Sequence, residues 1–148
     1  MAIGGKGRGL DTSSIDDVIG YRLRRAQLAV FTRFAARFAE ESLKPADYSA
    51  LVLIADNPGS TQSAIAAALG IKRANFVALT EGLARRGLID RRQPESDRRS
   101  HALHLTTEGE RLVSAIRKAQ QLFEAELVAE LGGEAARDTL VALLKRLG

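Results

Sequence analysis

The sequence predicts a mainly α-helical protein with a small β-wing, in which a winged helix-turn-helix domain is joined to a helical dimerisation region. Three observations predict this fold. A short helical stretch ends at Gly70, a longer one over residues 72–86 begins with basic residues, and residues 88–105 hold two strand-like stretches around a charged turn. In a winged helix-turn-helix, this order places the second helix in the DNA major groove and the hairpin beside it.

The composition of the 148 residues excludes several classes of site. The chain has no cysteine, which rules out a disulfide framework, a thiolate nucleophile and a cysteine metal site. No apolar run reaches 18 residues and the N-terminus lacks a secretion-signal pattern, so we expect a cytoplasmic protein with no membrane partner.

Positive charge is concentrated in one stretch. Residues 72–99 carry eight Lys/Arg and four Asp/Glu, a balance equal to the net +4 of the whole chain. Such a cluster is typical of a surface that faces a phosphate backbone, although a solvated basic face is an equally good account of charge alone.

The N-terminal region is predicted to be a flexible arm followed by a long helix. Residues 1–14 are glycine-rich and polar, and residues 15–42 repeat apolar side chains every three or four positions. We expect Ser13 or Ser14 to cap this helix, with Asp16 and Asp17 in its first turn. Because the helix is apolar on two sides, a second subunit or a ligand is expected to cover one of them.

The next two helices are marked by their end signals. Pro45 suits the first turn of a helix, and Asn57-Pro58-Gly59 ends it. Thr61 is expected to cap the following helix, and Gly70 supplies the turn at its end.

The helix over residues 72–86 is expected to read DNA with its outward face. Phe76, Leu79, Thr80 and Leu83 form a stripe that we assign to the core, and the opposite face holds Ala74, Val77, Ala78, Glu81 and Arg85. Near the N-terminus, Arg73 can read guanine and Asn75 can read adenine.

Residues 88–92 and 101–105 are predicted to pair as the strands of the wing. Residues 94–97 form its turn, and Arg98 with Arg99 lies at or beside the tip, where arginine suits a narrow minor groove. The residues expected to contact DNA are Thr61, Gln62, Lys72, Arg73, Ala74, Asn75, Val77, Ala78, Arg85, Arg91, Arg98 and Arg99.

The C-terminal region is predicted to be helical, with a cap at Thr106 or Thr107 and a break at Gly132-Gly133. Its apolar surface suggests a homodimer. We therefore divide the chain into an arm at 1–14, a dimerisation region at 15–44 and 107–148, and a DNA-binding domain at 45–106.

A ligand site is expected beside the first helix, where arginines alternate with aromatic residues. Guanidinium groups at the edge of aromatic side chains suit an aromatic acid. The candidate residues are Arg22, Arg25, Phe31, Phe34 and Tyr48. For each residue taken singly, a core stripe with solvated arginines is a slightly better account than a ligand site.

Residues 43–109 resemble the MarR family of bacterial transcription regulators. The motifs that carry the resemblance are RRGLIDR before the wing, SDRR within it and LTTEG after it, and the likeness extends over about residues 15–147. It implies a winged-helix homodimer that binds pseudopalindromic DNA, usually as a repressor released by a small molecule. Effectors in the family are often aromatic acids, sometimes as coenzyme A thioesters.

The positions where this family reads the major groove are matched by Arg73, Ala74, Asn75, Val77 and Ala78, and Arg98 falls at the wing tip. Asp97 and Arg99 match the family's acid-x-arginine pattern, in which the acid usually braces an arginine instead of touching DNA. Ser60 and Lys72 depart from the residues usual in the family at these positions, which puts local capping in question. The missing cysteine excludes the peroxide-sensing branch.

Three other functions remain open at this stage: a winged helix that binds protein or RNA, a DNA-binding protein without an effector, and an enzyme. The only histidines, His101 and His104, lie on or near the wing and have no plausible catalytic partners, so we interpret them as exposed strand residues. We expect no catalytic residue, no metal site and no cofactor.

Overall fold

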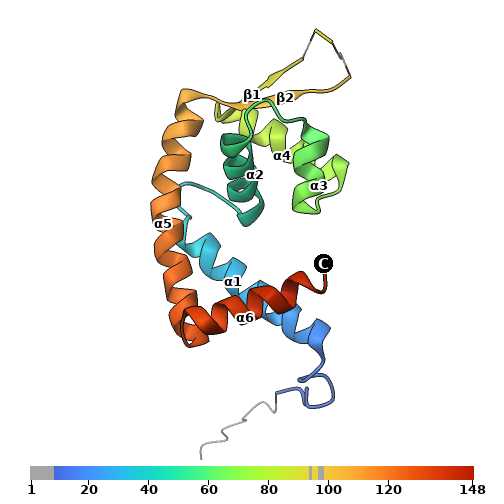
Figure 1. The fold of residues 1–148 in the computed structure, drawn as a ribbon, viewed down its shortest axis with the longest axis vertical. Helices are drawn as coiled ribbons and strands as arrows, with labels where there is room; N and C mark the ends of the chain where they lie inside the picture. The colour runs from blue at the N-terminus through green and yellow to red at the C-terminus, as the bar shows by residue number, and fades with distance from the viewer. Residues whose placement is uncertain (1–8, 94, 97–98) are drawn as a thin grey trace, which may run out of the picture. The chain divides into compact units, whose positions relative to one another are not determined.

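The computed structural model describes residues 9–93, 95–96 and 99–148, and the chain divides into two compact units between Ser42 and Leu43. In this described part, one helix lies in the first unit, and five helices and a two-stranded sheet form the second (Figure 1). The prediction of a mainly helical protein with a small β-wing is confirmed. No helix in these ranges has the length and apolarity needed to cross a membrane.

Helix α1 (Ile19–Arg37) is shorter than the predicted helix over residues 15–42. Residues 13–17 form turns, and Ser13 donates its backbone N–H to the Asp11 carboxylate at 3.0 Å. This local bond competes with helix formation. The expected capping by Ser13 or Ser14 is therefore wrong, as is the placement of Asp16 and Asp17 in the first turn. The residue before the helix is Val18, which provides no side-chain cap.

Helices α2 (Pro45–Asp56) and α3 (Gln62–Leu69) begin and end as predicted. Pro45 occupies the first turn of α2, and the Asp47 carboxylate accepts the backbone N–H of Lys44 at 3.0 Å. The Thr61 hydroxyl caps α3 by accepting the N–H of Ala64 at 3.2 Å. Gly70 ends α3 with φ +64°, a left-handed conformation that favours glycine.

Helix α4 (Arg73–Arg85) packs its predicted stripe into the core of the second unit. Phe76, Thr80 and Leu83 are buried, whereas Leu79 is only half-buried. The Thr80 hydroxyl donates to the Val77 carbonyl at 3.0 Å, which satisfies this buried polar group. Other core side chains that are at most 1% exposed include Leu51, Ile54, Leu103 and Ile116.

The wing is an antiparallel pair of strands, β1 (Ile89–Arg92) and β2 (Ala102–Leu105), with Ile89 opposite Leu105. Strand β2 also bonds to the segment that precedes α3. The Gly59 N–H donates to the Leu103 carbonyl at 2.8 Å, and the Leu103 N–H donates to the Ser60 carbonyl at 2.9 Å. The wing is thus attached by its second strand to the start of the helix-turn-helix.

Thr106 joins the wing to helix α5 (Thr107–Leu131). Its hydroxyl accepts the Gly109 N–H at 3.1 Å and donates to the Gly87 carbonyl at 2.5 Å, while its own N–H donates to the Leu88 carbonyl at 3.1 Å. A Cβ atom on Gly109 would lie 2.0 Å from the Leu88 carbonyl oxygen. The motifs RRGLIDR and LTTEG therefore meet in space. Thr106 links them by hydrogen bonds, and Gly109 permits their close approach.

Helix α6 (Glu134–Lys145) follows a break at Gly132 and Gly133, whose φ angles are +100° and +110°. The leucines of this C-terminal segment stay exposed by 39–67%: Leu140, Leu143, Leu144 and Leu147. No residue of α6 is buried. The chain therefore presents a continuous apolar helix face at its C-terminus.

Candidate nucleic-acid interface

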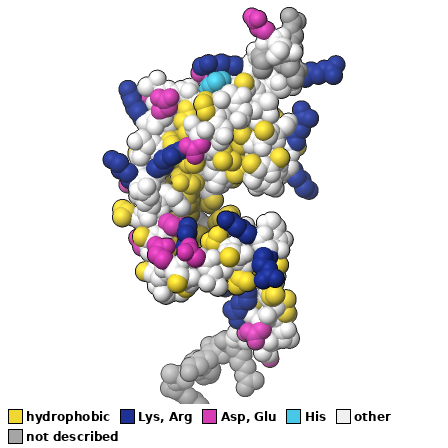
Figure 2. All heavy atoms as spheres, viewed as in Figure 1, with side chains coloured by type: hydrophobic (Ala, Val, Ile, Leu, Met, Phe, Trp, Pro, Cys, Tyr) yellow, Lys and Arg dark blue, Asp and Glu magenta, His cyan; other side chains and the backbone are white. Residues whose placement is uncertain are grey.

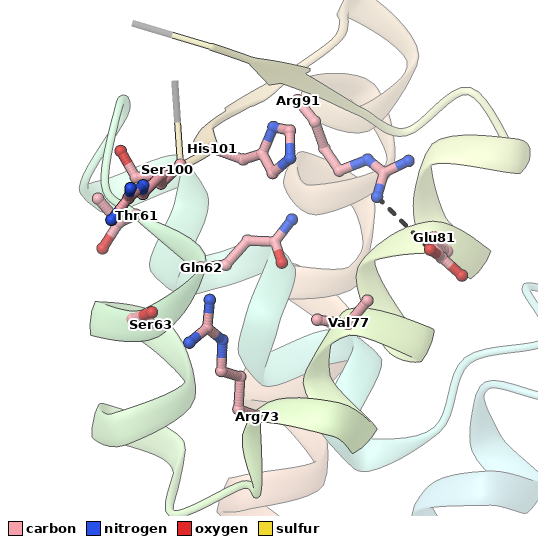
Figure 3. A pocket seen from close by; sticks show the side chains of 10 residues that line it. Thr61, Gln62, Ser63, Arg73, Val77, Glu81, Arg91, Ser100 and His101 are labelled. Atoms are coloured by element: carbon pink, nitrogen blue, oxygen red, sulfur yellow. Dashed lines mark ion pairs between the residues drawn. The ribbon is translucent and has the colours of Figure 1, made fainter. Parts of the chain in front are cut away.

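A cavity of about 320 Å³ lies where α3, α4 and the wing meet (Figure 3). Helix α3 contributes residues at its capped start, α4 contributes residues spaced by one turn, and the wing contributes residues at its base. The lining residues are Thr61, Gln62, Ser63, Arg73, Val77, Glu81, Arg91, Arg99, Ser100 and His101. The cavity is lined by three arginines and one carboxylate, so cationic groups from α4 and the wing converge on one concave surface.

The orientation of α4 follows from its buried stripe. Because Phe76, Thr80 and Leu83 fix one face in the core, residues 73, 77 and 81 fall on a face that looks toward the wing. Lys72 precedes α4 and provides no side-chain cap. The first N–H groups of the helix, which carry partial positive charge, therefore have no side-chain acceptor from that position.

One ion pair crosses the cavity, between Arg91 of β1 and Glu81 of α4 at 3.9 Å (Figure 3). A second links Arg92 to Asp90 along the exposed side of β1 at 3.8 Å. Figure 2 shows other Lys and Arg side chains projecting from the edge formed by α3, α4 and the wing. This surface keeps a cationic excess after its acidic residues are counted.

Six of the predicted DNA contacts line the cavity: Thr61, Gln62, Arg73, Val77, Arg91 and Arg99. Four more are exposed on or beside α4 but outside the cavity: Lys72, Ala74, Asn75 and Arg85. Ala78 lines a separate depression with Lys44 and Arg86. Arg98, with Asp97, falls outside the described residues.

Four lining residues were not predicted: Ser63, Glu81, Ser100 and His101. The spacing of Arg73, Val77 and Glu81 at i, i+4 and i+8 places Glu81 in line with two predicted contacts, so this signal is present in the sequence. His101 and His104 were expected to be exposed strand residues, which is wrong: both are half-buried, and only His104 lies in a strand. The His101 side chain lies in the cavity wall, and its Nδ1 atom is buried without a hydrogen-bond partner.

A second cavity, of about 350 Å³, lies between α2, α5 and α6 and contains one predicted ligand residue, Tyr48. Its other lining residues are Val52, Arg117, Gln120, Gln121, Glu124 and Arg137. Burial raises the pKa of the Tyr48 hydroxyl, with nearby Arg117 opposing the shift, so the phenol stays protonated at neutral pH. The amide oxygen of Gln120 is buried without a partner.

Arg117 connects this second cavity to the end of α2. Its guanidinium donates to the Asp56 carboxylate at 2.6 Å, an ion pair between residues 61 positions apart. On the opposite side, Arg137 lies 3.9 Å from Glu124 and 2.8 Å from Asp138. Sequence reasoning missed Arg117, Gln120 and Arg137, because no local pattern indicates that α5 and α6 face Tyr48.

The other predicted ligand residues, Arg22, Arg25, Phe31 and Phe34, belong to the first unit. Arg22 lies 3.9 Å from Asp16 and 6.0 Å from the centre of the Tyr21 ring. The rings of Phe34 and Phe38 are 4.4 Å apart. Within the described ranges, no cluster of three or more His, Asp or Glu side chains could hold a metal ion.

Comparison with known proteins gives consistent matches. The family model described as MarR family matches residues 42–100. A protein of Thauera aromatica, assigned as a transcriptional regulatory protein for the hcr operon, is 38% identical over 130 residues, which cover 87% of this chain and 78% of that protein. Such relatives are transcription regulators and not enzymes, which agrees with the prediction from sequence.

Solved structures of the transcriptional repressor CouR are similar over nearly the whole chain. CouR bound to a 23-mer DNA duplex is 39% identical with a TM-score of 0.86, covering 95% of this chain and 99% of that one. CouR bound to p-coumaroyl-CoA is 37% identical with a TM-score of 0.85, covering 93% and 96% of the two chains.

Proposed function

The chain belongs to the MarR family of transcription regulators, and on that premise we propose that it is a DNA-binding repressor released by a small aromatic effector. The observation that carries the proposal is the convergence of Arg73, Arg91 and Arg99 on one cavity between α3, α4 and the wing. CouR, whose fold is closely similar, has been solved on a DNA duplex.

Each part of this surface has a distinct role in the proposal. Arg73 and Asn75, at the start of α4, read base edges in the major groove, because both side chains can form bidentate hydrogen bonds to purines. Ala74, Val77 and Ala78 offer apolar contacts to thymine methyl groups. The residues that contact the backbone or the minor groove are Thr61, Gln62, Lys72, Arg85, Arg91, Arg98 and Arg99. Such backbone contacts position the protein without reading sequence.

A homodimer accounts for the exposed apolar face at the C-terminus. The leucines from Leu140 to Leu147 stay open to solvent in one chain, and a two-fold partner covers such a face with the same residues of its own. Residues 15–44 and 107–148 then form the dimerisation region and residues 45–106 the DNA-binding domain. Two half-sites of a pseudopalindromic operator lie one helical turn apart, roughly 34–36 Å.

The effector is an aromatic acid or its coenzyme A thioester. The cavity beside Tyr48 supports this class, because it combines a protonated phenol with the guanidinium groups of Arg117 and Arg137. Guanidinium groups suit a carboxylate or phosphate. CouR has been solved with p-coumaroyl-CoA. Arg22, Arg25, Phe31 and Phe34 of the first unit stay predicted ligand residues, as inferred from their sequence pattern alone.

Release from DNA requires that the effector bind the DNA-free protein more tightly than the DNA-bound protein. Reversing an operator occupied 99:1 takes about 10⁴-fold preference, or roughly 5.5 kcal/mol. Arg117 offers a route for this preference, since it lines the cavity and also holds Asp56 at the end of α2. An anionic effector that engages Arg117 competes with that ion pair.

The test is fluorescence anisotropy of a labelled duplex from the promoter of the chain's own gene, with an unrelated duplex of equal length as control. We expect tight binding to the promoter and release by 4-hydroxycinnamic acid or p-coumaroyl-CoA. Calorimetry of the free protein with both compounds is repeated on Tyr48→Phe, Arg22→Ala and Arg25→Ala. Equal affinity for the two duplexes refutes sequence-specific regulation. Ligand binding unchanged in all three variants refutes the effector site.

A further inference from the structure

We propose that the cavity beside Tyr48 selects an ester or thioester of an aromatic acid over the free acid, and that Glu124 is the residue that sets this preference. The preference rests on the proposed function and narrows the effector to a compound that is uncharged at its acyl group. The reason is the charge around the cavity, where each guanidinium group is already paired with carboxylates of the chain.

Both arginines of the cavity are held by carboxylates. The Arg117 guanidinium donates to Asp56 at 2.6 Å. The Arg137 guanidinium donates to Asp138 at 2.8 Å and lies 3.9 Å from the Glu124 carboxylate. A ligand carboxylate at either arginine therefore replaces an ion pair that exists already, so it gains less than it would from an unpaired guanidinium.

Glu124 places a negative charge in the wall of the cavity itself. Its side chain belongs to the lining and is 49% exposed, so a ligand in the cavity can approach it. Further acidic side chains surround the same two arginines. The carboxylates that pair with them or act on them electrostatically are Asp56, Glu124, Glu134 and Asp138. The cavity therefore has more negative than positive charge in and around its wall.

The Tyr48 hydroxyl shows how this charge acts inside the cavity. Burial is the main cause of its raised pKa; Arg117 lowers the pKa, and the Asp56 and Glu124 carboxylates raise it. Burial and both carboxylates thus disfavour an anion at this position, and Arg117 favours one. A ligand carboxylate beside the phenol would meet the same groups.

Solvent moderates the repulsion, because the Arg117 and Glu124 side chains are 43% and 49% exposed. One unfavourable charge a few ångströms away in such a site changes affinity by about tenfold. An ester or thioester carries no charge at the acyl group and avoids this repulsion. In a coenzyme A thioester, the phosphates lie on the carrier and not on the acyl group that would enter the cavity.

The test is calorimetry of the full chain with three compounds that share one ring: 4-hydroxycinnamic acid, its methyl ester and p-coumaroyl-CoA. At neutral pH and low salt we expect the ester and the thioester to bind about tenfold more tightly than the acid. Added salt should narrow the ester-to-acid ratio, because it screens the repulsion of the acid. The methyl ester separates the effect of acyl charge from any contact that coenzyme A makes.

Three variants assign the preference to Glu124. Glu124→Gln removes the charge at nearly constant size and should bring the ester-to-acid ratio close to one. Glu124→Asp keeps the charge and should keep the preference. Glu108→Gln is the matched control and should show the wild-type ratio, because Glu108 is also a glutamate of α5 paired with an arginine, Arg111, but does not line the cavity.

An acid that binds as tightly as the methyl ester overturns the inference and leaves the proposed function intact, as does an ester that fails to bind while the thioester binds. A wild-type ratio in Glu124→Gln also overturns it, and so does a changed ratio in Glu108→Gln. If none of the three compounds binds, the proposed effector class is refuted, and the inference with it.

Discussion

Gly109→Ala sets two physical effects against each other. Glycine in a helix is less favourable than alanine by about 0.5–1 kcal/mol, so helix propensity alone predicts that the variant is more stable. The position of Gly109 predicts the opposite. Its added Cβ would lie 2.0 Å from the Leu88 carbonyl oxygen, far inside the roughly 3.3 Å at which carbon and oxygen ordinarily touch.

To relieve this overlap, the start of α5 must retreat by more than about 1 Å. Thr106 links that start to the end of α4, so the retreat stretches its bonds to Gly87 and Leu88. Each weakened bond costs about 1 kcal/mol, and overpacking adds about 1–3 kcal/mol. After the gain in propensity is subtracted, we expect a net loss of about 2–4 kcal/mol in the free energy of unfolding.

Thermal and urea denaturation at one fixed protein concentration measure this loss, because the stability of the proposed dimer would depend on concentration. A loss of this size lowers Tm by about 5–15 °C. Gly82→Ala is the matched control, since a Cβ on Gly82 in α4 meets no atom within 4 Å, and we expect it to stabilise by about 0.5–1 kcal/mol. A Gly109→Ala variant as stable as the wild type would refute the reasoning.

Four further predictions concern DNA binding and assembly. With six to ten phosphate contacts in the complex, affinity should fall by about 10³–10⁵ between 50 and 200 mM salt, and a nearly flat dependence would contradict DNA binding. Arg73→Ala or Asn75→Ala should lose roughly 1–3 kcal/mol of discrimination at particular base pairs, whereas Arg98→Ala should weaken binding on all sequences; a uniform loss in all three would show that the readers are misassigned. Glu81→Gln, which frees Arg91 from its ion pair, should tighten binding to promoter and unrelated duplexes alike, and weaker binding would show that the pair positions Arg91 for DNA. Light scattering at micromolar concentration should give the mass of a dimer, and the mass of a monomer would contradict the proposed binding of two half-sites by a homodimer.

The sequence was most informative where structure is set locally. Thr61, Gly70 and Thr106 were predicted correctly as caps or turns, because a cap depends on residues within three or four positions. The start of α1 was predicted wrongly, although its cause is also local. Asp11 captures the Ser13 N–H in a turn that periodicity does not reveal.

The candidate sites were predictable to the extent that they lie on one helix. Periodicity placed Val77 on the outward face of α4 and Arg73 beside that face, and both line the cavity. Residues brought in by long-range pairing were harder to identify. His101 reaches the cavity because β2 bonds to the segment before α3, and Arg117 reaches Tyr48 because α5 packs on α2. Neither contact has a signal within a short window of sequence.

The attachment of the wing has an evolutionary consequence. Its base is fixed on both sides, by β1 along one edge of β2 and by Gly59 and Ser60 along the other, and Thr106 anchors the point where it leaves for α5. The turn between the strands lies beyond all of these anchors. Insertions, deletions and charge changes there leave the register and the reading helix undisturbed. If the wing tip contacts the minor groove and α4 reads the major groove, as proposed, sequence changes in the turn would alter minor-groove preference while major-groove recognition is retained.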